Sequence, residues 1–401
     1  MRSETAWEVV ELSQICTYRQ ERIEVDKLTT SNYISTANML PNKSGIEVAD
    51  NLPNTKTTSR FYVNDVLVSN IRPYFKKAWL ATLDGGCSND VLVMRALDDV
   101  YAPYLYYLLS SDQFFAYMTS TAKGTKMPRG DKDAIMRYMI QKPPLGVQKA
   151  IADILSCLDS KIELNNKINE NLEAQVQAIF KSWFVYFEPF QDGEFVESEL
   201  GLIPEGWVVS SVKGVSKEVV TGKTPRTSDQ ENYGNHMMFI TIPDMRDNVF
   251  IIQSERYLSK RGVATQPNKT LPANSILVSC IATAGLVSLT SEHSQTNQQI
   301  NAIIPKEGIS PYFLYSYMKT LSDHVINLGS GGTTTVNLNK GQFSNIKLII
   351  PSPEVMERFH YSISPLFLKI KQNQRESTNL AILRDTLLPK LMSGEIEVPV
   401  D

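Results

Sequence analysis

The sequence has few cysteines and none of the cysteine patterns that hold a metal cluster or a disulfide framework. Its four cysteines, Cys16, Cys87, Cys157 and Cys280, form no Cys-x-x-Cys pair. No apolar run approaches the ~18 residues of a membrane span, and residues 1–13 lack the apolar segment of a signal peptide. We therefore expect a protein of the reducing cytoplasm, with no membrane partner.

An excess of charge of either sign is missing as well. The 401 residues include 40 Lys plus Arg and 43 Asp plus Glu, which gives a formal net charge of -3. This balance excludes a uniformly basic coat for nucleic acid or membrane, but it allows a local basic groove. At about 100–200 residues per domain, the length predicts two or three domains.

The motifs of common catalytic sites are absent too. The sequence contains no G-x-G-x-x-G, G-x-x-x-x-G-K-[ST], H-E-x-x-H or G-x-S-x-G motif. The run Lys142-Pro143-Pro144-Leu145 has prolines, but it lacks the catalytic polar residue and the stacking aromatic of an amino-methyltransferase motif. We expect no catalytic residue, no metal site and no cofactor bound by this chain.

What the sequence does contain is an internal repeat, which is the first feature to establish in a chain of this length. Pro143 aligns with Pro351 at an offset of 208 residues, and the same offset holds without gaps over about seventy residues. All four histidines lie in the second copy, so a histidine site would have no counterpart in the first. The same offset also matches Pro103 with Pro311, Gly124 with Gly332, Lys161 with Lys369, Asn165 with Asn373 and Asn171 with Asn379.

Each copy begins with a globular part of mixed α/β (α+β) character. Short β-rich runs are separated by Gly, Pro, Asn and Asp, which punctuate strands. A helix is expected over residues 103–118 and over residues 311–325, each followed by a loop and a last strand. The runs expected to form strands include residues 61–63, 66–68, 138–141, 238–242, 276–278 and 346–350.

Beyond Pro143 and Pro351 the apolar period becomes about 3.5 residues, which is typical of a helical seam. Each seam lasts ~38 residues, or ~57 Å of helix, and Pro365 is expected to kink or interrupt the second helix. Such seams are too long and narrow for a globular core, so we predict two long helices packed as a coiled coil. The residues predicted for the helix seam or for contact with a partner subunit are Ile162, Asn165, Ile168, Leu172, Phe180, Trp183, Ile370, Asn373 and Leu380.

Asn165 and Asn373 occupy equivalent positions of the two seams. A buried asparagine can fix the register of two helices at some cost in stability, whereas a local phase shift would turn both side chains toward solvent. The sequence leaves both interpretations open. A parallel tandem would require the second globular part to return its chain from the far end of the first helix, so we predict antiparallel helices.

Basic residues gather in loops of the globular parts. Between residues 55 and 79, five basic residues and several aromatic residues accompany one acid, and between residues 123 and 137 five basic residues accompany two acids. Lys and Arg in such loops neutralise phosphates, and Arg, Asn, Gln and Thr reach base edges, although a charge run is more often a solvated surface. The residues predicted to contact DNA are Arg72, Lys76, Lys77, Lys123, Thr125, Lys126, Arg129, Lys223, Thr224, Arg226, Thr333 and Thr334.

Several segments together are similar to those of one known family. They are the hinges at residues 143–151 and 349–353, the helix at 158–184, the run Gly201-Leu202-Ile203-Pro204-Glu205-Gly206-Trp207, the turn Gly222-Lys223-Thr224-Pro225 and the closing run at 387–396. In these segments, and over nearly its whole length, the sequence resembles the specificity subunits of bacterial Type I restriction-modification systems.

The resemblance implies a non-catalytic subunit whose two target-recognition domains each read one half of a bipartite DNA target. It also implies that the helices act as a ruler for the unread spacer between the two half-sites. The implied partners are double-stranded DNA, two modification subunits that bind S-adenosylmethionine and methylate adenine, and restriction subunits.

On this basis the chain divides into four parts. These are target-recognition domain 1 (residues 1–142), a central helical spacer region (143–188), target-recognition domain 2 (189–350) and a C-terminal helical spacer region (351–401). The alternative from another class is a coiled-coil scaffold that joins proteins without binding DNA. A scaffold would explain the seams, but it would not explain Gly, Thr and Lys loops at repeated positions.

Overall fold

The computed structural model describes residues 7–330 and 336–399. These residues form two compact units. The first unit consists of the residues up to Ser160 together with those from Leu380 onward, and the second unit consists of Lys161–Asn379. Each unit therefore combines a globular part with portions of both long helices.

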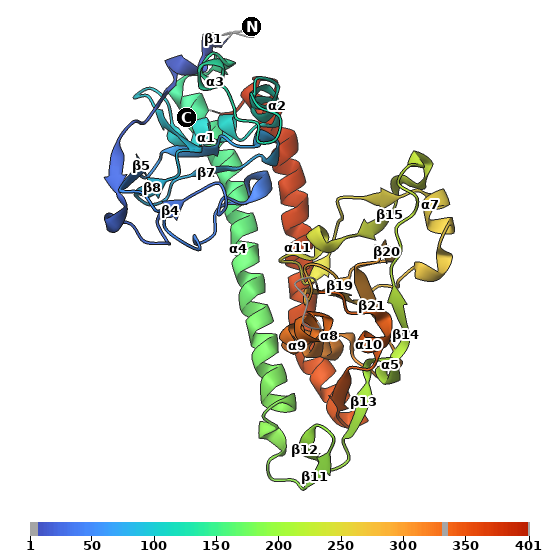
Figure 1. Cartoon of the computed structure of the whole chain (residues 1–401). Helices are drawn as coiled ribbons and strands as arrows, with labels where there is room; N and C mark the ends of the chain where they lie inside the picture. The colour runs from blue at the N-terminus through green and yellow to red at the C-terminus, as the bar shows by residue number, and fades with distance from the viewer. Residues whose placement is uncertain (1–6, 331–335, 400–401) are drawn as a thin grey trace. The chain divides into compact units, whose positions relative to one another are not determined.

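The first unit contains two small four-stranded sheets and a separate strand pair (Figure 1). The strand orders are β2-β9-β6-β7, β3-β5-β8-β4 and β1-β10, and β4 pairs with β8 in parallel whereas the other pairs are antiparallel. The strands are β1 (Glu8–Glu11), β2 (Cys16–Tyr18), β3 (Arg22–Glu24), β4 (Tyr33–Ile34), β5 (Thr57–Phe61), β6 (Val66–Ser69), β7 (Ala78–Leu80), β8 (Gly85–Cys87), β9 (Val91–Ala96) and β10 (Met139–Lys142). The helices are α1 (Ala102–Leu109), α2 (Asp112–Ser120), α3 (Lys132–Met136) and the beginning of α4 (Leu145–Phe184).

The core of the first unit lies where the sheet around β6 meets the helices. All four residues of β6 are buried, as expected for a strand with no solvent-facing side. Val66 and Val68 belong to one apolar cluster with Tyr104 of α1 and Phe114 of α2, and Leu391 of the long helix α11 (Pro353–Met392) joins the same cluster. The C-terminal segment of the chain is therefore part of the first unit's core.

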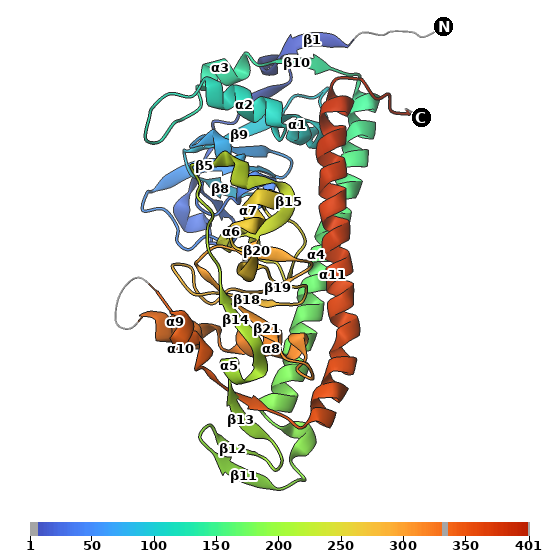
Figure 2. The same cartoon turned by 90° about the vertical axis from the view of Figure 1, so that its right-hand side faces the viewer.

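The second unit repeats this arrangement with additional elements (Figure 2). Its strand orders are β14-β21-β18-β19-β16, β17-β15-β20, β13-β22 and β11-β12. The strands are β11 (Phe195–Ser198), β12 (Gly201–Pro204), β13 (Val208–Ser211), β14 (Ser216–Thr221), β15 (Tyr233–Ile240), β16 (Phe250–Ile251), β17 (Tyr257–Leu258), β18 (Ile276–Ser279), β19 (Val287–Thr290), β20 (Ser294–Thr296), β21 (Ile300–Pro305) and β22 (Lys347–Ile350). The helices are α5 (Val212–Val215), α6 (Ile242–Met245), α7 (Lys260–Ala264), α8 (Pro311–Thr320), α9 (Ser322–Ser330), α10 (Lys340–Ser344) and α11 (Pro353–Met392).

The strand registers confirm that the two units are copies of one mixed helix-and-strand fold. Val66 of β6 pairs with Met94 of β9, and Ile276 of β18 pairs with Ile303 of β21. The order β2-β9-β6-β7 of the first unit recurs as β14-β21-β18-β19 in the second. The parallel pair β4 and β8 likewise recurs as β15 and β20.

The two long helices are each continuous over 40 residues. Pro365 was expected to kink or interrupt the second helix, and the interruption is wrong, because α11 extends from Pro353 to Met392 without a break. Proline removes one backbone donor, but Ile363 and Phe367 on either side of it are fully buried, and this packing holds the helix together. Within the described parts of the chain, no helix has the length and apolarity needed to cross a membrane.

Other expected boundaries are also corrected. The helix expected over residues 103–118 is two helices, because Ser111 begins α2 by accepting a hydrogen bond from the backbone N–H of Phe114 (3.2 Å). The segment 311–325 is likewise divided at Leu321, between α8 and α9. The strand expected over residues 61–63 ends at Phe61, and that expected over residues 238–242 ends at Ile240.

Candidate nucleic-acid interface

Three loops of the first unit meet beyond the end of β6, and backbone hydrogen bonds hold them together. The N–H of Asn70, after β6, donates to the carbonyl of Asp90 before β9 (2.8 Å). The carbonyl of Asn70 accepts from Gly130 (3.1 Å), and the N–H of Arg72 donates to the carbonyl of Pro128 (2.8 Å). We call residues 70–77, 88–90 and 123–130 the first loop cluster.

The second unit contains the same three hydrogen bonds. The N–H of Cys280 donates to the carbonyl of Gln299 (2.8 Å), and the carbonyl of Cys280 accepts from Leu338 (2.9 Å). The N–H of Ala282 donates to the carbonyl of Val336 (3.1 Å). Residues 280–285, 297–299 and 336–338 are therefore the second loop cluster. Each of its members lies 208 to 210 residues beyond its counterpart in the first cluster.

The backbone geometry of the two clusters also agrees. Arg72 and Ala282 both adopt a left-handed conformation, with φ of 49° and 64°, which is unfavourable for residues other than glycine. The residues just before them form matching β-bridges, Ile71 with Arg129 and Ile281 with Asn337. Two unlike sequences therefore keep one strained turn, and such strain is most often retained where it positions functional groups.

The two arginines of the first cluster have different surroundings. Arg129 is 53% exposed, and its guanidinium donates from Nε to Oδ1 of Asp90 (3.1 Å) and from Nη2 to Oδ2 (3.4 Å). Arg72 is half-buried, and its Nε has no partner among the described residues. A buried N–H without a partner is costly, and Arg72 carries such a group whereas Arg129 does not.

Several lysines predicted to contact DNA are held by the first unit itself. Lys76 forms an ion pair with Asp112 (2.9 Å), and Lys123 forms one with Asp131 (2.5 Å). Lys77 donates from Nζ to the carbonyl of Thr36 (2.7 Å), and its burial lowers the pKa of the ammonium group. The exposed residues Thr125 and Lys126 lie on the same loop as Arg129.

The predicted turn of the second unit borders the second loop cluster. Lys223 donates its N–H to the carbonyl of Thr296 (2.9 Å), and the Thr224 hydroxyl donates to Oε1 of Gln298 (2.7 Å). Gly222 has no space for a side chain, because an added Cβ would lie 2.1 Å from the carbonyl oxygen of Asn297. Lys223 and Arg226 are exposed. The predicted residues Thr333 and Thr334 lie outside the described residues.

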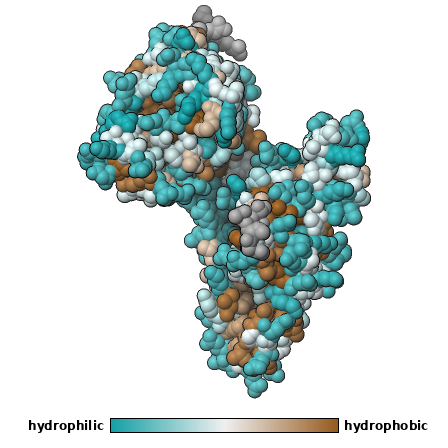
Figure 3. All heavy atoms as spheres, in the orientation of Figure 1, coloured by the Kyte–Doolittle hydropathy of each residue, from teal (hydrophilic) through white to brown (hydrophobic). Residues whose placement is uncertain are grey.

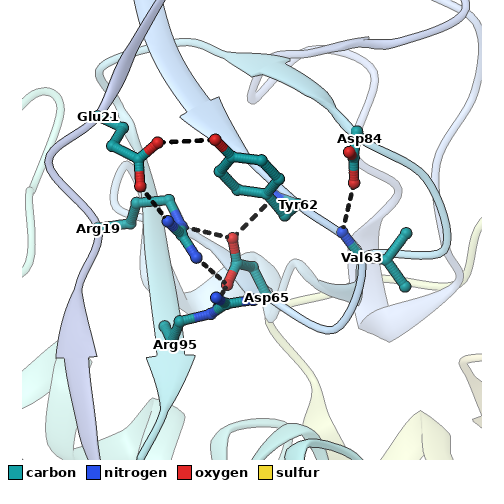
Figure 4. A network of polar contacts seen from close by, with 7 residues as sticks. All are labelled: Arg19, Glu21, Tyr62, Val63, Asp65, Asp84 and Arg95. Atoms are coloured by element: carbon teal, nitrogen blue, oxygen red, sulfur yellow. Dashed lines mark hydrogen bonds and ion pairs between the residues drawn. The ribbon is translucent and has the colours of Figure 1, made fainter.

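A polar network that the sequence did not reveal lies at the start of β6, at the opposite end of this strand from the first loop cluster (Figure 4). The carboxylate of Asp65 is fully buried and accepts from Nε of Arg19 (2.8 Å), from Nε of Arg95 (2.9 Å) and from the backbone N–H of Tyr62 (2.8 Å). The Tyr62 hydroxyl donates to Glu21 (2.7 Å), which also pairs with Arg19. The network connects β2, β6 and β9, and these contacts between residues far apart in the chain have no signature in the sequence.

The two seam asparagines are both buried, so the solvent-facing alternative does not apply. Asn165 donates from Nδ2 to Oε2 of Glu376 (2.8 Å) and to Oγ of Ser377 (3.3 Å). Asn373 donates from Nδ2 to Oδ1 of Asn169 (2.9 Å). The offset of 208 relates Asn165 to Asn373 and Asn169 to Ser377, so these hydrogen bonds are repeat-related.

The apolar seam residues are buried to different degrees. Phe180 and Ile370 are fully buried in the second unit's core, and Trp183 and Leu172 are partly buried against the same core. The Arg358 guanidinium lies 4.5 Å from the centre of the Trp183 ring, a distance at which a cation–π interaction is favourable. The remaining seam residues, Ile162, Ile168 and Leu380, are half-buried.

The described residues offer no constellation for metal catalysis. Among residues 7–330 and 336–399, no group of three or more His, Cys, Asp or Glu side chains could hold a metal ion. His360, the most enclosed histidine, stacks on Tyr312 and hydrogen-bonds Ser310 (2.8 Å), and burial lowers its pKa.

Figure 3 shows that the face of the first unit in view is mostly hydrophilic with scattered hydrophobic residues.

Comparison with known proteins identifies a family over most of the chain. The model of the Type I restriction modification DNA specificity domain matches residues 4–174 and 204–377. The two matches correspond to the two copies of the internal repeat. This agreement indicates that the repeated unit is the same unit that the family model describes.

Two curated relatives and one solved structure extend the comparison. The specificity subunit of the Type I restriction enzyme HindI from Haemophilus influenzae is 33% identical over 461 aligned residues, which cover 97% of this chain and 99% of that protein. The MjaIX specificity subunit from Methanocaldococcus jannaschii is 29% identical, with 75% of this chain and 70% of that protein covered. The crystal structure of the S subunit of a Type I restriction-modification system from M. genitalium is similar in fold, with a TM-score of 0.56, 15% identity and 98% and 97% coverage.

Proposed function

The chain belongs to the Type I restriction modification DNA specificity family, and on this basis we propose that it selects the DNA sequence for a Type I restriction-modification complex. In this role it catalyses no reaction itself. Each loop cluster reads one half of a bipartite target. Its partner subunits carry out methylation and restriction at the selected site.

The observation that carries this proposal is the repetition of the loop scaffold with different side chains. The two clusters share three backbone hydrogen bonds and a left-handed turn, so both present side chains in the same way. The side chains themselves differ, with Arg72 and Arg129 in the first cluster at the positions of Ala282 and Asn337 in the second. Because base edges are read by the identity of the side chain, one scaffold with two side-chain sets fits two unlike half-sites.

We further propose that α4 and α11 pair as an antiparallel coiled coil whose length sets the spacer between the half-sites. Within the second unit, Asn165 contacts Ser377 and Asn169 contacts Asn373, so positions that rise along α4 fall along α11. Within the first unit, Asp159 near the middle of α4 pairs with Arg384 near the end of α11 (2.6 Å). A polar residue on a coiled-coil seam fixes register, which a ruler requires.

Modification subunits that bind S-adenosylmethionine are the partners that would supply methylation. Exposed apolar side chains on the long helices support such docking. In the second unit Leu164, Tyr361 and Leu368 are 51%, 69% and 59% exposed, so the long helices carry apolar surface that a docked subunit would cover. Restriction subunits and double-stranded DNA complete the proposed assembly.

The direct test is the pattern of methylated adenines in a host that carries this chain with its modification partner. We expect a single bipartite motif with two different half-sites and a fixed gap. A gel shift of the same complex on DNA with and without that motif gives the affinity ratio. If the complex neither shifts DNA nor methylates a defined sequence, the coiled-coil scaffold becomes the better description.

A further inference from the structure

We infer that Arg129 and Asn337 are the base-reading side chains of the two loop clusters, Arg129 for guanine and Asn337 for adenine. This inference rests on the proposed function and deepens it by assigning a base to each half-site. The two residues are related by the offset of 208. Both form the same β-bridge with the turn after the preceding strand, Arg129 with Ile71 and Asn337 with Ile281.

The hydrogen bonds from Arg129 to Asp90 leave other N–H donors of the guanidinium available to contact a base. Asp90 accepts from Nε and Nη2, which form one side of the guanidinium. An arginine has five N–H donors, so the N–H groups of Nη1 and the second N–H of Nη2 remain at its far end. Two such donors match the O6 and N7 acceptors of guanine in the major groove.

The charge of the pair favours a base over a phosphate as its ligand. Asp90 neutralises much of the positive charge of Arg129, and a carboxylate near a phosphate is repulsive, so the pair contributes little to phosphate binding. It keeps, however, a fixed and directional set of donors, because a held side chain loses less entropy on binding. Lys126 on the same loop is exposed and forms no ion pair with an acid of the described residues, which suits a phosphate contact instead.

The second cluster presents a neutral amide at the same position. Asn337 is exposed, and none of the hydrogen bonds among the described residues involves its side chain. An asparagine amide carries one donor group and one acceptor, which match N7 and N6 of adenine. Gln299 stands where the first cluster has Asp90, so the second cluster has no carboxylate that would require an arginine.

The test uses the full chain with its modification partner and compares Arg129→Gln with the wild type. Reading of guanine predicts that Arg129→Gln weakens binding to the wild-type site by about ten- to hundredfold. It also predicts that the methylated motif changes at one guanine of one half-site, with the other half-site unchanged. Asn337→Ala is expected to relax one adenine of the other half-site and to leave the first unchanged.

Two further variants distinguish base reading from phosphate binding and from a structural role. Arg129→Lys keeps the positive charge but loses the paired N–H donors of the guanidinium. The complex with Arg129→Lys is therefore expected to methylate the same altered motif as the complex with Arg129→Gln. Lys126→Ala is expected to weaken binding to all sequences alike and to lower the salt dependence of log K by about one unit. Asp90→Asn, which loosens Arg129, is expected to reduce discrimination for that guanine, and binding to unrelated DNA should strengthen because a negative charge is removed.

The inference is overturned if Arg129→Gln methylates the wild-type motif, or if Arg129→Lys restores that motif fully. It is equally overturned if one substitution changes both half-sites. None of these results would affect the proposed function, because the wild-type complex would still methylate one defined sequence. Loss of sequence preference in the wild-type complex would instead remove the proposed function itself.

Discussion

The two units keep the same backbone connections and differ in the charges around them. In the first unit the buried carboxylate of Asp65 holds Arg19 and Arg95. At the corresponding positions of the second unit, the strand ladders place Ser275 and Ile304. The three hydrogen bonds between the loops are nevertheless present in both. The repeat therefore retains what positions the loops, and the side chains around that scaffold are free to diverge.

The same contrast recurs where the globular parts meet the long helices. In the second unit an aromatic cluster fills this region, and in the first unit aliphatic residues occupy the matching positions. Both sets are buried, so the requirement is to fill the volume, and the type of side chain is secondary. The aromatic set is Phe180, Phe184, Phe313 and Phe359, and the aliphatic set is Leu388, Met392, Leu105 and Ile151, each pair related by the offset of 208.

The largest expected effect follows from this packing difference. Phe359 is fully buried, and its ring contacts Phe184 at 4.8 Å and Trp183 at 5.7 Å between centroids. Phe359→Ala should therefore destabilise the second unit by about 4 kcal/mol, because a large cavity replaces the ring. Hydrogen exchange followed by mass spectrometry measures each unit separately. The matched variant Ile151→Ala should cost the first unit about 3 kcal/mol, and a larger loss for Ile151→Ala would contradict this account.

The sequence predicted the repeat, the mixed fold and the two long helices, because the offset of 208 and the apolar period extend over many residues. It did not predict local endings that depend on single hydrogen bonds, such as the start of α2 at Ser111. It also missed the network around Asp65, because Arg95 and Arg19 lie 30 and 46 residues along the chain from the carboxylate that they contact. The position of Asn337 could have been found by applying the offset to Arg129. The pairing of Arg129 with Asp90 could not, because it arises only when the loops are folded together.

A second prediction concerns an ion pair that only the first unit has. Asp159 pairs with Arg384 (2.6 Å) and accepts from the Tyr107 hydroxyl (2.7 Å), whereas the matching positions of the second unit hold Phe367 and Val176, both buried. Arg384→Val should cost about 2 kcal/mol, because it leaves the largely enclosed carboxylate of Asp159 without its cation. The double variant D159F/R384V copies the second unit and should be more stable than Arg384→Val alone. The same hydrogen-exchange experiment measures the stability of the first unit. If the losses from the two single substitutions simply add in the double variant, the unpaired carboxylate is not the cause of the destabilisation.

The smallest expected effect tests the turn that both units share. Ala282 is exposed and has a φ of 64°, a conformation that costs an L-residue about 1–2 kcal/mol. Ala282→Gly removes this cost but loses about 0.5–1 kcal/mol of that gain to the greater freedom of unfolded glycine. The second unit should therefore become more stable by about 0.5 kcal/mol, with its methylated motif unchanged. The neighbouring variant Thr283→Gly has no such strain to relieve and should be destabilising.

In the first unit, glycine at the equivalent left-handed position is expected to change stability and DNA recognition in opposite directions. Arg72→Gly relieves the equivalent strain, with a φ of 49°, and should also stabilise its unit slightly. It also removes the guanidinium whose Nε lacks a partner among the described residues. Binding of the complex to DNA should therefore weaken although the first unit becomes more stable. Thermal unfolding and gel shifts on the two variants give the comparison. If Arg72→Gly leaves DNA affinity unchanged, the strained turn serves only to join the loops, and the difference between Arg72 and Ala282 has no part in the choice of sequence.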